Sequence, residues 1–207
     1  MERPLELIGT VVRLQVQRSR LKPGPRGARV YDPSPLLEVA ALLVGPHGVV
    51  GLTDEGPVLD VHHADHPDTR NVRRINGLSL LPRAHYGALR ARYGGHLLDG
   101  VAGESLLLDT GRCWRAEDLT GPLVLETTDG LLPLHDVRVA APCVEFSRFC
   151  LRHGPGPVDD RVMQAMAHLD DGARGFYVRA AGEGRVEVGA RLLRAAGRLP
   201  GGRAPRT

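Results

Sequence analysis

The sequence predicts a mainly β protein, a barrel or a sandwich, with about three helices packed on the outside. Three observations support this fold class. Short apolar segments of strand-like composition outnumber segments with helical periodicity. Most of the strand-like segments are bounded by glycine. Thr128-Asp129-Gly130 joins two of them in a pattern that is typical of a tight β-hairpin.

The size and composition fit one soluble globular domain. The chain has 207 residues, of which 42% are hydrophobic and 25% are charged. No apolar run approaches the length of a membrane span, and the first residues lack the apolar stretch of a signal peptide, so the expected compartment is the cytoplasm. We expect one domain over residues 1–193, followed by a disordered, arginine-rich tail at residues 194–207.

The basic character of the chain is local. The tail carries four arginines and no acid, which accounts for the formal net charge of +3. Such a tail is usually a solvated end, so we expect no nucleic-acid partner. The three cysteines, Cys113, Cys143 and Cys150, do not make a disulfide framework. The sequence leaves the oligomeric state undecided.

In the first third of the chain, strand-like segments alternate with loops. Residues 5–17 predict a strand, because apolar and polar residues alternate in its second half and leave one face for water. The prolines and glycines of residues 18–35 predict a loop. The apolar residues 36–44 fit a strand or a short helix, and residues 49–53 fit another strand.

The rest of the chain predicts three helices and further strands. Helical composition or periodicity marks residues 84–93, the segment that begins at Cys143, and residues 158–169. The remaining strands are expected within residues 77–81, 101–108, 123–127, 131–140, 175–180 and 185–193.

Cys143 is the residue that we expect to carry chemistry. It follows the strand-like residues 131–140 and Pro142, and Phe146 and Cys150 follow it at helical spacing. In the first turn of a helix, free backbone N–H groups and the positive end of the helix dipole favour a thiolate over a thiol. The alternative is a buried thiol that acts only as a small hydrophobic side chain.

Histidines and aspartates gather within residues 60–67. Imidazole and carboxylate groups are good zinc or iron ligands, so His62, His63 and His66, with Asp65, are candidate ligands of a metal-dependent hydrolase. Their spacing matches no metal motif, since His62 and His63 would point to opposite faces of a strand. A polar loop at the rim of a pocket is the alternative.

A small cationic cluster follows this loop. Arg70, Arg73 and Arg74 lie close together in the sequence and suit an anionic ligand. The alternative is a solvated basic loop.

Four parts of the chain, taken in order, carry a family resemblance. Residues 9–14 resemble an opening strand, and residues 100–106 resemble a Gly-Glu-Asn segment. Pro142-Cys143 stands at the site of a characteristic cysteine, and residues 174–179 and 184–189 resemble two closing strands. The family with these features is the MOSC domain, which is named after the C-terminal part of molybdenum-cofactor sulfurase.

The chain also departs from the family pattern. Ser105 stands where the family usually has Asn, and Ala190 stands where it usually has Asp. Residues 51–56 replace the usual Gly-Leu-x-Gly-Asp-Arg-His stretch. The pocket chemistry is therefore expected to differ. No pyridoxal-phosphate desulfurase region is visible, so the resemblance is to a stand-alone domain.

The resemblance implies a β-barrel whose pocket holds Cys143. In the family, this cysteine is thought to carry sulfur or to ligate molybdenum in a pterin cofactor, so the implied activity is sulfur transfer or a molybdenum-dependent reductase reaction, with a sulfur-donating desulfurase as a possible type of partner. The phosphate of the cofactor is expected to lie near cationic side chains. The candidates for cofactor binding are Arg70, Arg73, Arg74, Arg148, Arg174 and Glu104. The alternative is a binding module without chemistry that holds a small anion, with Cys143 as part of its wall.

Overall fold

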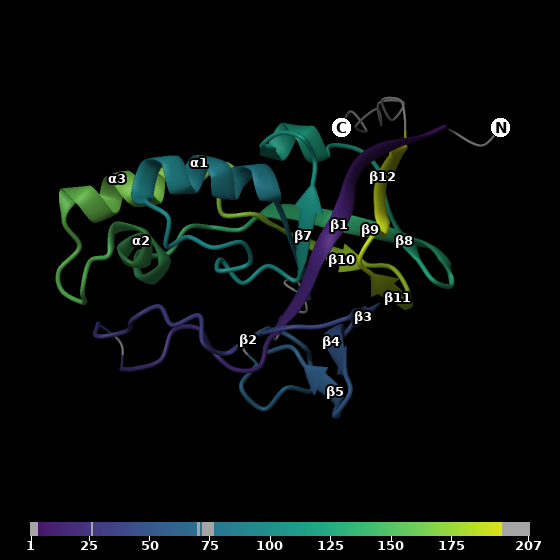
Figure 1. The fold of residues 1–207 in the computed structure, drawn as a ribbon, viewed down its shortest axis with the longest axis horizontal. Coiled ribbons are helices and arrows are strands. Elements are labelled where there is room, and N and C mark those ends of the chain that lie inside the picture. The colour runs from purple at the N-terminus through teal and green to yellow at the C-terminus, as the bar shows by residue number, and fades with distance from the viewer. Residues whose placement is uncertain (1–3, 26, 70, 72–76, 196–207) are drawn as a thin grey trace, which may run out of the picture.

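The computed structural model describes residues 4–25, 27–69, 71 and 77–195, and it confirms the mainly β fold (Figure 1). Its central body is a closed barrel of seven strands. These strands are β1 (Leu5–Gln17), β6 (Leu78–Pro82), β7 (Leu106–Asp109), β8 (Leu123–Thr127), β9 (Gly130–Val139), β10 (Phe176–Ala180) and β12 (Arg191–Ala195).

The barrel closes because its first and last strands pair with each other. The strand order is β12-β8-β9-β10-β6-β7-β1, and β1 pairs back onto β12. The pairs are antiparallel except for β6 and β7, which run parallel. The predicted Asp-Gly hairpin is present between β8 and β9, where Thr127 lies opposite Gly130. Closure gives every barrel strand two neighbours, which removes exposed strand edges.

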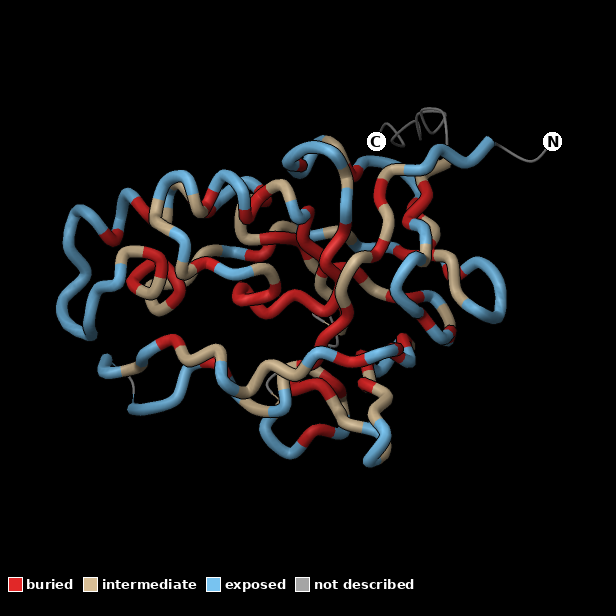
Figure 2. Tube along the Cα trace, viewed as in Figure 1, coloured by how far each residue is buried: buried red, intermediate tan, exposed pale blue. Residues whose placement is uncertain are grey.

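Alternation along the strands fills the barrel interior. In β10, Phe176, Val178 and Ala180 are buried, whereas Tyr177 and Arg179 are only half-buried. The buried side chains form one cluster, to which most barrel strands contribute leucine or valine. Figure 2 shows the buried residues concentrated where the barrel strands cross.

A second, four-stranded sheet packs against the barrel. Its order is β11 (Gly184–Glu187), β3 (Ala41–Gly45), β4 (Gly48–Thr53) and β5 (Gly56–Leu59). The short strand β2 (Leu36–Glu38) pairs with the end of β1. Leu42, Val44, Val49 and Val186 of this sheet belong to the same buried cluster as the barrel interior, so the two sheets share one core.

Three helices lie together on one side of the barrel (left in Figure 1). They are α1 (Arg83–Tyr93), α2 (Val144–Leu151) and α3 (Asp160–His168), all of which the sequence predicts. The apolar faces of α1 and α2 contribute to a second buried cluster, which includes Tyr86 of α1, Phe146 of α2 and Tyr31 from the loop of residues 18–35. Among the described residues, no helix is long and apolar enough to cross a membrane.

The structure divides two segments that the sequence leaves whole. Residues 36–44 form β2 and β3, because the first part pairs with β1 and the second with β4. Residues 185–193 form parts of β11 and β12, which belong to different sheets. The strand β5 and the 3₁₀ helix η1 (Ala116–Leu119) were not predicted.

The last barrel strand extends beyond the predicted domain boundary. β12 continues to Ala195, and the Arg194 guanidinium lies 2.8 Å from the Glu6 carboxylate of β1. Arg194 therefore belongs to the barrel, whereas the expected disordered tail was placed from this residue onward. Residues 196–207 lie outside the described residues.

Candidate functional site

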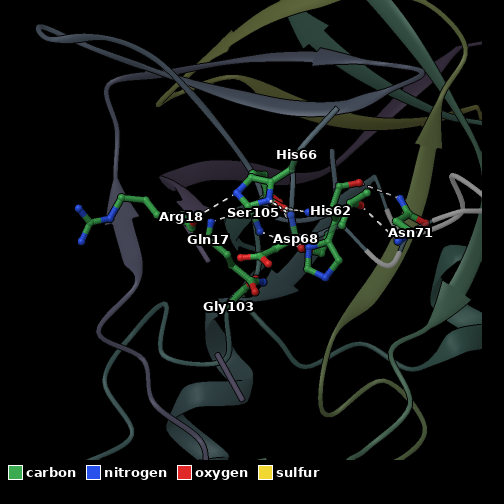
Figure 3. Close-up of polar contacts among 11 residues, drawn as sticks. Gln17, Arg18, His62, His66, Asp68, Asn71, Gly103 and Ser105 are labelled. Atoms are coloured by element: carbon green, nitrogen blue, oxygen red, sulfur yellow. Dashed lines mark hydrogen bonds and ion pairs between the residues drawn. The ribbon is translucent and has the colours of Figure 1, made fainter. Parts of the chain in front are cut away.

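The C-terminal end of β1 is tied to two loops by polar contacts (Figure 3). The buried Asp60 carboxylate accepts hydrogen bonds from the backbone N–H groups of Gln17 (2.7 Å) and His62 (2.8 Å). The Gln17 side chain donates from Nε2 to the carbonyl of Gly103 (2.6 Å). The end of β1 thus holds the loop after β5 and the loop before β7 around the same space.

A cavity of about 210 Å³ lies at these loops, and its walls are cationic. Arg20, Lys22, Arg29 and Arg174 line it, whereas Asp68 supplies the one carboxylate of its described walls. Asp68 lies 3.6 Å from Arg20, so its charge is already matched. The remaining cations give the cavity a positive field, which attracts anions.

Arg174 is the wall residue best placed to bind an anion. It is half-buried, and its guanidinium carbon lies 4.3 Å from the centre of the Phe146 ring of α2. It forms no ion pair or hydrogen bond through its side chain within the described part of the chain. Burial works against its charge, but Tyr31, Cys143 and Tyr177 act in the opposite direction and raise the pKa of Arg174 above its ordinary value. Its charged N–H donors are therefore available to a ligand.

Cys143 lies close to this arginine. It caps the N-terminus of α2, where its carbonyl accepts hydrogen bonds from the backbone N–H (3.0 Å) and hydroxyl (2.9 Å) of Ser147. The residue is half-buried and is near enough to interact electrostatically with Arg174, Tyr31 and Tyr177. These three residues line the cavity, whereas Cys143 does not. The predicted helix start is confirmed, and the thiol stands next to the cavity wall.

The other two cysteines have different surroundings. All three cysteines are free thiols. Cys150 is fully buried in α2, and burial raises the pKa of its thiol to about 12. Cys113 is exposed and lies in the segment between β7 and η1. Neither of them lines the cavity beside Arg174.

Glu104 is a buried carboxyl group near the same arginine. Glu104 is 3% exposed. The Tyr86 hydroxyl donates to its carboxylate and lies 3.0 Å from Oε1 and 2.9 Å from Oε2. Burial raises the pKa of Glu104 to about 7, although the Tyr86 hydrogen bond and the Arg174 charge act in the opposite direction. The group can therefore change its protonation state near neutral pH.

The other predicted arginines lie elsewhere. The buried Arg148 donates from Nη2 to the carbonyls of Gly156 and Pro157, which ties the loop after α2 to the helix. It does not line the cavity beside Arg174. Arg70, Arg73 and Arg74 lie outside the described residues.

The histidine-rich loop is held by hydrogen bonds. His62 Nδ1 lies 2.9 Å from Asp60 Oδ1, and His62 also lines the cationic cavity. The ring of His66 uses both nitrogens: Nδ1 accepts from the Asp68 N–H (3.0 Å), and Nε2 lies 3.1 Å from the Arg18 carbonyl (Figure 3).

His63 does not line the cationic cavity. It lines a different cavity, of about 520 Å³, beside the four-stranded sheet. Within the described ranges, no group of three or more His, Cys, Asp or Glu residues is arranged to hold a metal ion. These contacts support the interpretation of His62, His63 and His66 as parts of a polar loop.

Among the wall residues that the sequence reasoning missed are Lys22, Arg29 and Tyr31. They lie in the loop of residues 18–35, which was treated only as a connection. One signal was present, because five cationic residues fall within residues 18–29 of this loop. Nothing in the sequence indicates that the loop packs beside Arg174.

Comparison with known proteins shows the fold. No protein-family model and no curated protein matches the sequence. The solved structure of the YuaD protein from Bacillus subtilis is similar with a TM-score of 0.55 at 9% identity, over 92% of this chain and 97% of that chain. A hypothetical protein of known structure gives a TM-score of 0.53 at 14% identity, over 92% of this chain and 70% of the other.

A weaker match is to YiiM from Escherichia coli. Its TM-score is 0.49 at 14% identity, over 96% of this chain and 71% of that chain. The YuaD protein and the hypothetical protein, both with TM-scores above 0.5, show that the chain shares its fold with structures of very different sequence.

Proposed function

We propose that the chain is a MOSC-type domain that binds a small anionic sulfur donor beside Arg174 and accepts sulfur on the Cys143 thiol. The observation that carries the proposal is Arg174, a half-buried guanidinium with no ion pair among the described residues, at the wall of a cationic cavity and close to Cys143. The family assignment is supported by the ordered sequence segments and by the closed barrel.

The chemistry fits the residues that lie together. A thiolate at Cys143 attacks the outer sulfur of a donor such as thiosulfate, and the sulfur–sulfur bond of the donor breaks. Sulfite leaves with the bonding electron pair, and Cys143 carries one additional sulfur atom as a persulfide. Arg174 holds the anionic oxygens of the donor during the attack. A persulfide on a desulfurase would supply sulfur by the same exchange.

The molybdenum-pterin cofactor that the family resemblance implies fits the site only in part. When bound, such a cofactor supplies a metal centre for oxygen-atom transfer. Cys143 offers a soft sulfur ligand, and Arg174 and Arg29 offer charges for a phosphate group. However, the cavity of about 210 Å³ is smaller than the ~300–1,000 Å³ that is usual for ligands of such size. This volume favours a small anion over a whole pterin.

One observation favours a second function, a binding module without chemistry. Cys143 is half-buried and is not one of the residues that line the cavity. An anion could therefore bind at Arg174 without reaching the thiol. In that case the protein binds sulfate as well as thiosulfate, and no sulfur moves to Cys143.

Four proteins test the proposal: the wild type and the variants Arg174→Met, Cys143→Ser and Arg148→Met. Each is titrated with thiosulfate by calorimetry and then analysed by mass spectrometry. We expect binding and one extra sulfur atom on Cys143 in the wild type, at least tenfold weaker binding in Arg174→Met, and no gain of sulfur in Cys143→Ser. Arg148→Met is the matched control, since it removes a nearby arginine that does not line the cavity.

Each other outcome has a defined meaning. Equal thiosulfate binding in the wild type and Cys143→Ser, without a gain of sulfur in either, supports the binding module. Binding that Arg174→Met retains, or that Arg148→Met loses to the same extent, contradicts the assignment of the anion site to Arg174. No thiosulfate binding by the wild type overturns both functions.

A further inference from the structure

We infer that the cavity beside Arg174 binds its anion together with one proton, which the carboxyl group of Glu104 holds. The inference rests on the proposed anion site and names what that site requires. It assigns to Glu104 a role as a positioning residue, which acts on the ligand through its charge and not by direct contact.

The geometry places Glu104 next to the anion site with room for one water molecule. Glu104 lines a cavity of about 20 Å³. Three residues, Gln17, Arg174 and Tyr177, line both this cavity and the larger cationic one. A volume above ~10–15 Å³ can hold one water molecule when polar groups surround it. A protonated Glu104 can thus donate a hydrogen bond toward the ligand through a single water.

The charged and titratable groups around Glu104 come from four parts of the chain. Arg13 of β1 and Arg174, which precedes β10, are the cations that act on it. Tyr86 of α1 donates to its carboxylate, and Tyr31 of the loop at residues 18–35 also interacts with it. Burial raises the pKa of both tyrosines, so they stay neutral. Among these groups, Glu104 is therefore the one whose charge can change near neutral pH.

Two negative charges compete for the same guanidinium. When Glu104 is ionised, its carboxylate compensates the charge of Arg174, which has no ion pair among the described residues. An anion that enters the cavity then meets a like charge in a poorly solvated site. When Glu104 is protonated, the full charge of Arg174 acts on the ligand. Because burial raises the pKa of Glu104 to about 7, both forms are populated near neutral pH.

Sulfate is a suitable probe, since it stays fully ionised across the neutral range. For a protein that binds sulfate only when Glu104 is protonated, the affinity falls about tenfold between about pH 6 and about pH 8. We expect this loss in the wild type. In Glu104→Gln, which keeps an acceptor for the Tyr86 hydroxyl, the affinity should be equal at both pH values and close to the wild-type value at about pH 6.

His62 requires a matched control, because it lines the same cavity and histidine is, as a residue type, a common source of pH dependence. His62→Gln should keep the tenfold loss. A loss that disappears in His62→Gln and persists in Glu104→Gln overturns the inference and leaves the anion site standing. An affinity of the wild type that does not change with pH has the same consequence.

A second measurement does not depend on a variant that folds. Calorimetry of the wild type in two buffers of different ionisation enthalpy reports the protons taken up on binding. We expect about half a proton per sulfate at about pH 7. An uptake of zero contradicts the role of Glu104. The absence of both sulfate and thiosulfate binding at every pH instead overturns the proposed function itself, so the two failures are distinguishable.

Discussion

Two buried or half-buried arginines near α2 show how partners decide the role of a charged side chain. Arg148 is 6% exposed, and its Nη2 donates to the carbonyls of Gly156 and Pro157. Its Nε has no hydrogen-bond partner. Arg174 has no described acceptor and lines a cavity. The first arginine therefore holds a loop, and the second remains available to a ligand.

The role of Arg148 predicts a loss of stability without a loss of anion binding. Arg148→Met keeps most of the buried aliphatic volume but removes the hydrogen bonds to the loop after α2. We expect the free energy of unfolding to fall by about 1–2 kcal/mol, because hydrogen bonds from a charged group are lost while the unpartnered Nε is also removed. Urea denaturation measures this change, and limited proteolysis should show faster cleavage within residues 152–159.

The control is Arg152→Met, one turn further along. Arg152 is exposed, so its replacement should change the free energy of unfolding by less than about 0.5 kcal/mol. If Arg148→Met is as stable as this control and its loop is cleaved no faster, Arg148 does not hold the loop.

At the scale of elements, β1 organises the site through its glutamines. Gln15 and Gln17 donate from Nε2 to the carbonyls of Gly100 (2.7 Å) and Gly103 (2.6 Å) in the loop before β7. Both glycines have positive φ angles, +88° and +84°. The loop that carries Glu104 thus needs glycine at both of these positions, which precede Glu104, to approach the strand this closely.

This arrangement predicts that Gly103→Ala is severe. A Cβ at residue 103 would lie 2.7 Å from Leu21 Cδ1 and 2.9 Å from Gln17 Nε2, in addition to the strained φ. We expect the free energy of unfolding to fall by about 2–4 kcal/mol and sulfate binding to weaken, because Gln17 lines the cavity.

Gly111→Ala is the matched control for the backbone. Gly111 also has a positive φ, +69°, but no atom lies within 4 Å of a Cβ built there. It should show the conformational cost alone, about 1 kcal/mol, with unchanged sulfate binding. Equal losses of stability in the two variants would mean that the close contacts at Gly103 have no effect of their own.

Most elements could be predicted because their signals are local. β1, the hairpin of β8 and β9, and all three helices follow from alternation, turn residues and helical periodicity. The divisions within residues 36–44 and 185–193 could not be predicted, since they arise where the chain passes from one sheet to the other. That change of partner is a tertiary event without a local pattern.

The same distinction holds for the site. Cys143, Arg174 and Glu104 could be selected from the sequence, through the helix start and the family resemblance. Lys22, Arg29 and Tyr31 could not, because only the folded chain brings their loop beside residues that follow more than a hundred positions later. Arg148 has a suitable charge, but its loop contacts appear only in the structure.

At the scale of the whole molecule, two buried titratable groups oppose each other in their effect on stability. His85 of α1 is 5% exposed, and its Nε2 accepts a hydrogen bond from the Trp114 N–H (3.0 Å). Burial lowers the pKa of His85 from 6.5 to about 4, whereas burial raises that of Glu104 from 4.5 to about 7. Burial thus favours the neutral form of each group, which is the deprotonated imidazole of His85 and the protonated carboxyl of Glu104.

The signs follow from which state binds more protons. Between about pH 4 and 6.5, the unfolded state binds the additional proton at His85, so the stability from His85 increases as the pH rises. Between about pH 4.5 and 7, the folded state binds the additional proton at Glu104, so the stability from Glu104 decreases as the pH rises. Over the overlap of these windows, the two contributions largely cancel in the wild type.

Conservative variants should separate the two contributions. In Glu104→Gln, the free energy of unfolding relative to wild type should increase by about 2 kcal/mol from about pH 5 to about pH 7, because the cost of ionising a buried carboxyl is removed. His85→Gln keeps an acceptor for the Trp114 N–H. Its free energy of unfolding relative to wild type should decrease from about pH 5 to about pH 7, because only the wild type gains stability as the histidine of its unfolded state loses its proton.

Urea denaturation of the three proteins at several pH values, without multivalent anions, measures these differences. Comparison with wild type at each pH cancels the titration of the exposed carboxyl groups, which the three proteins share. Parallel curves for Glu104→Gln and the wild type would mean that Glu104 has the same pKa folded and unfolded. The carboxyl would then be solvated in the folded protein, and its coupling to an anion at Arg174 would lose its physical basis.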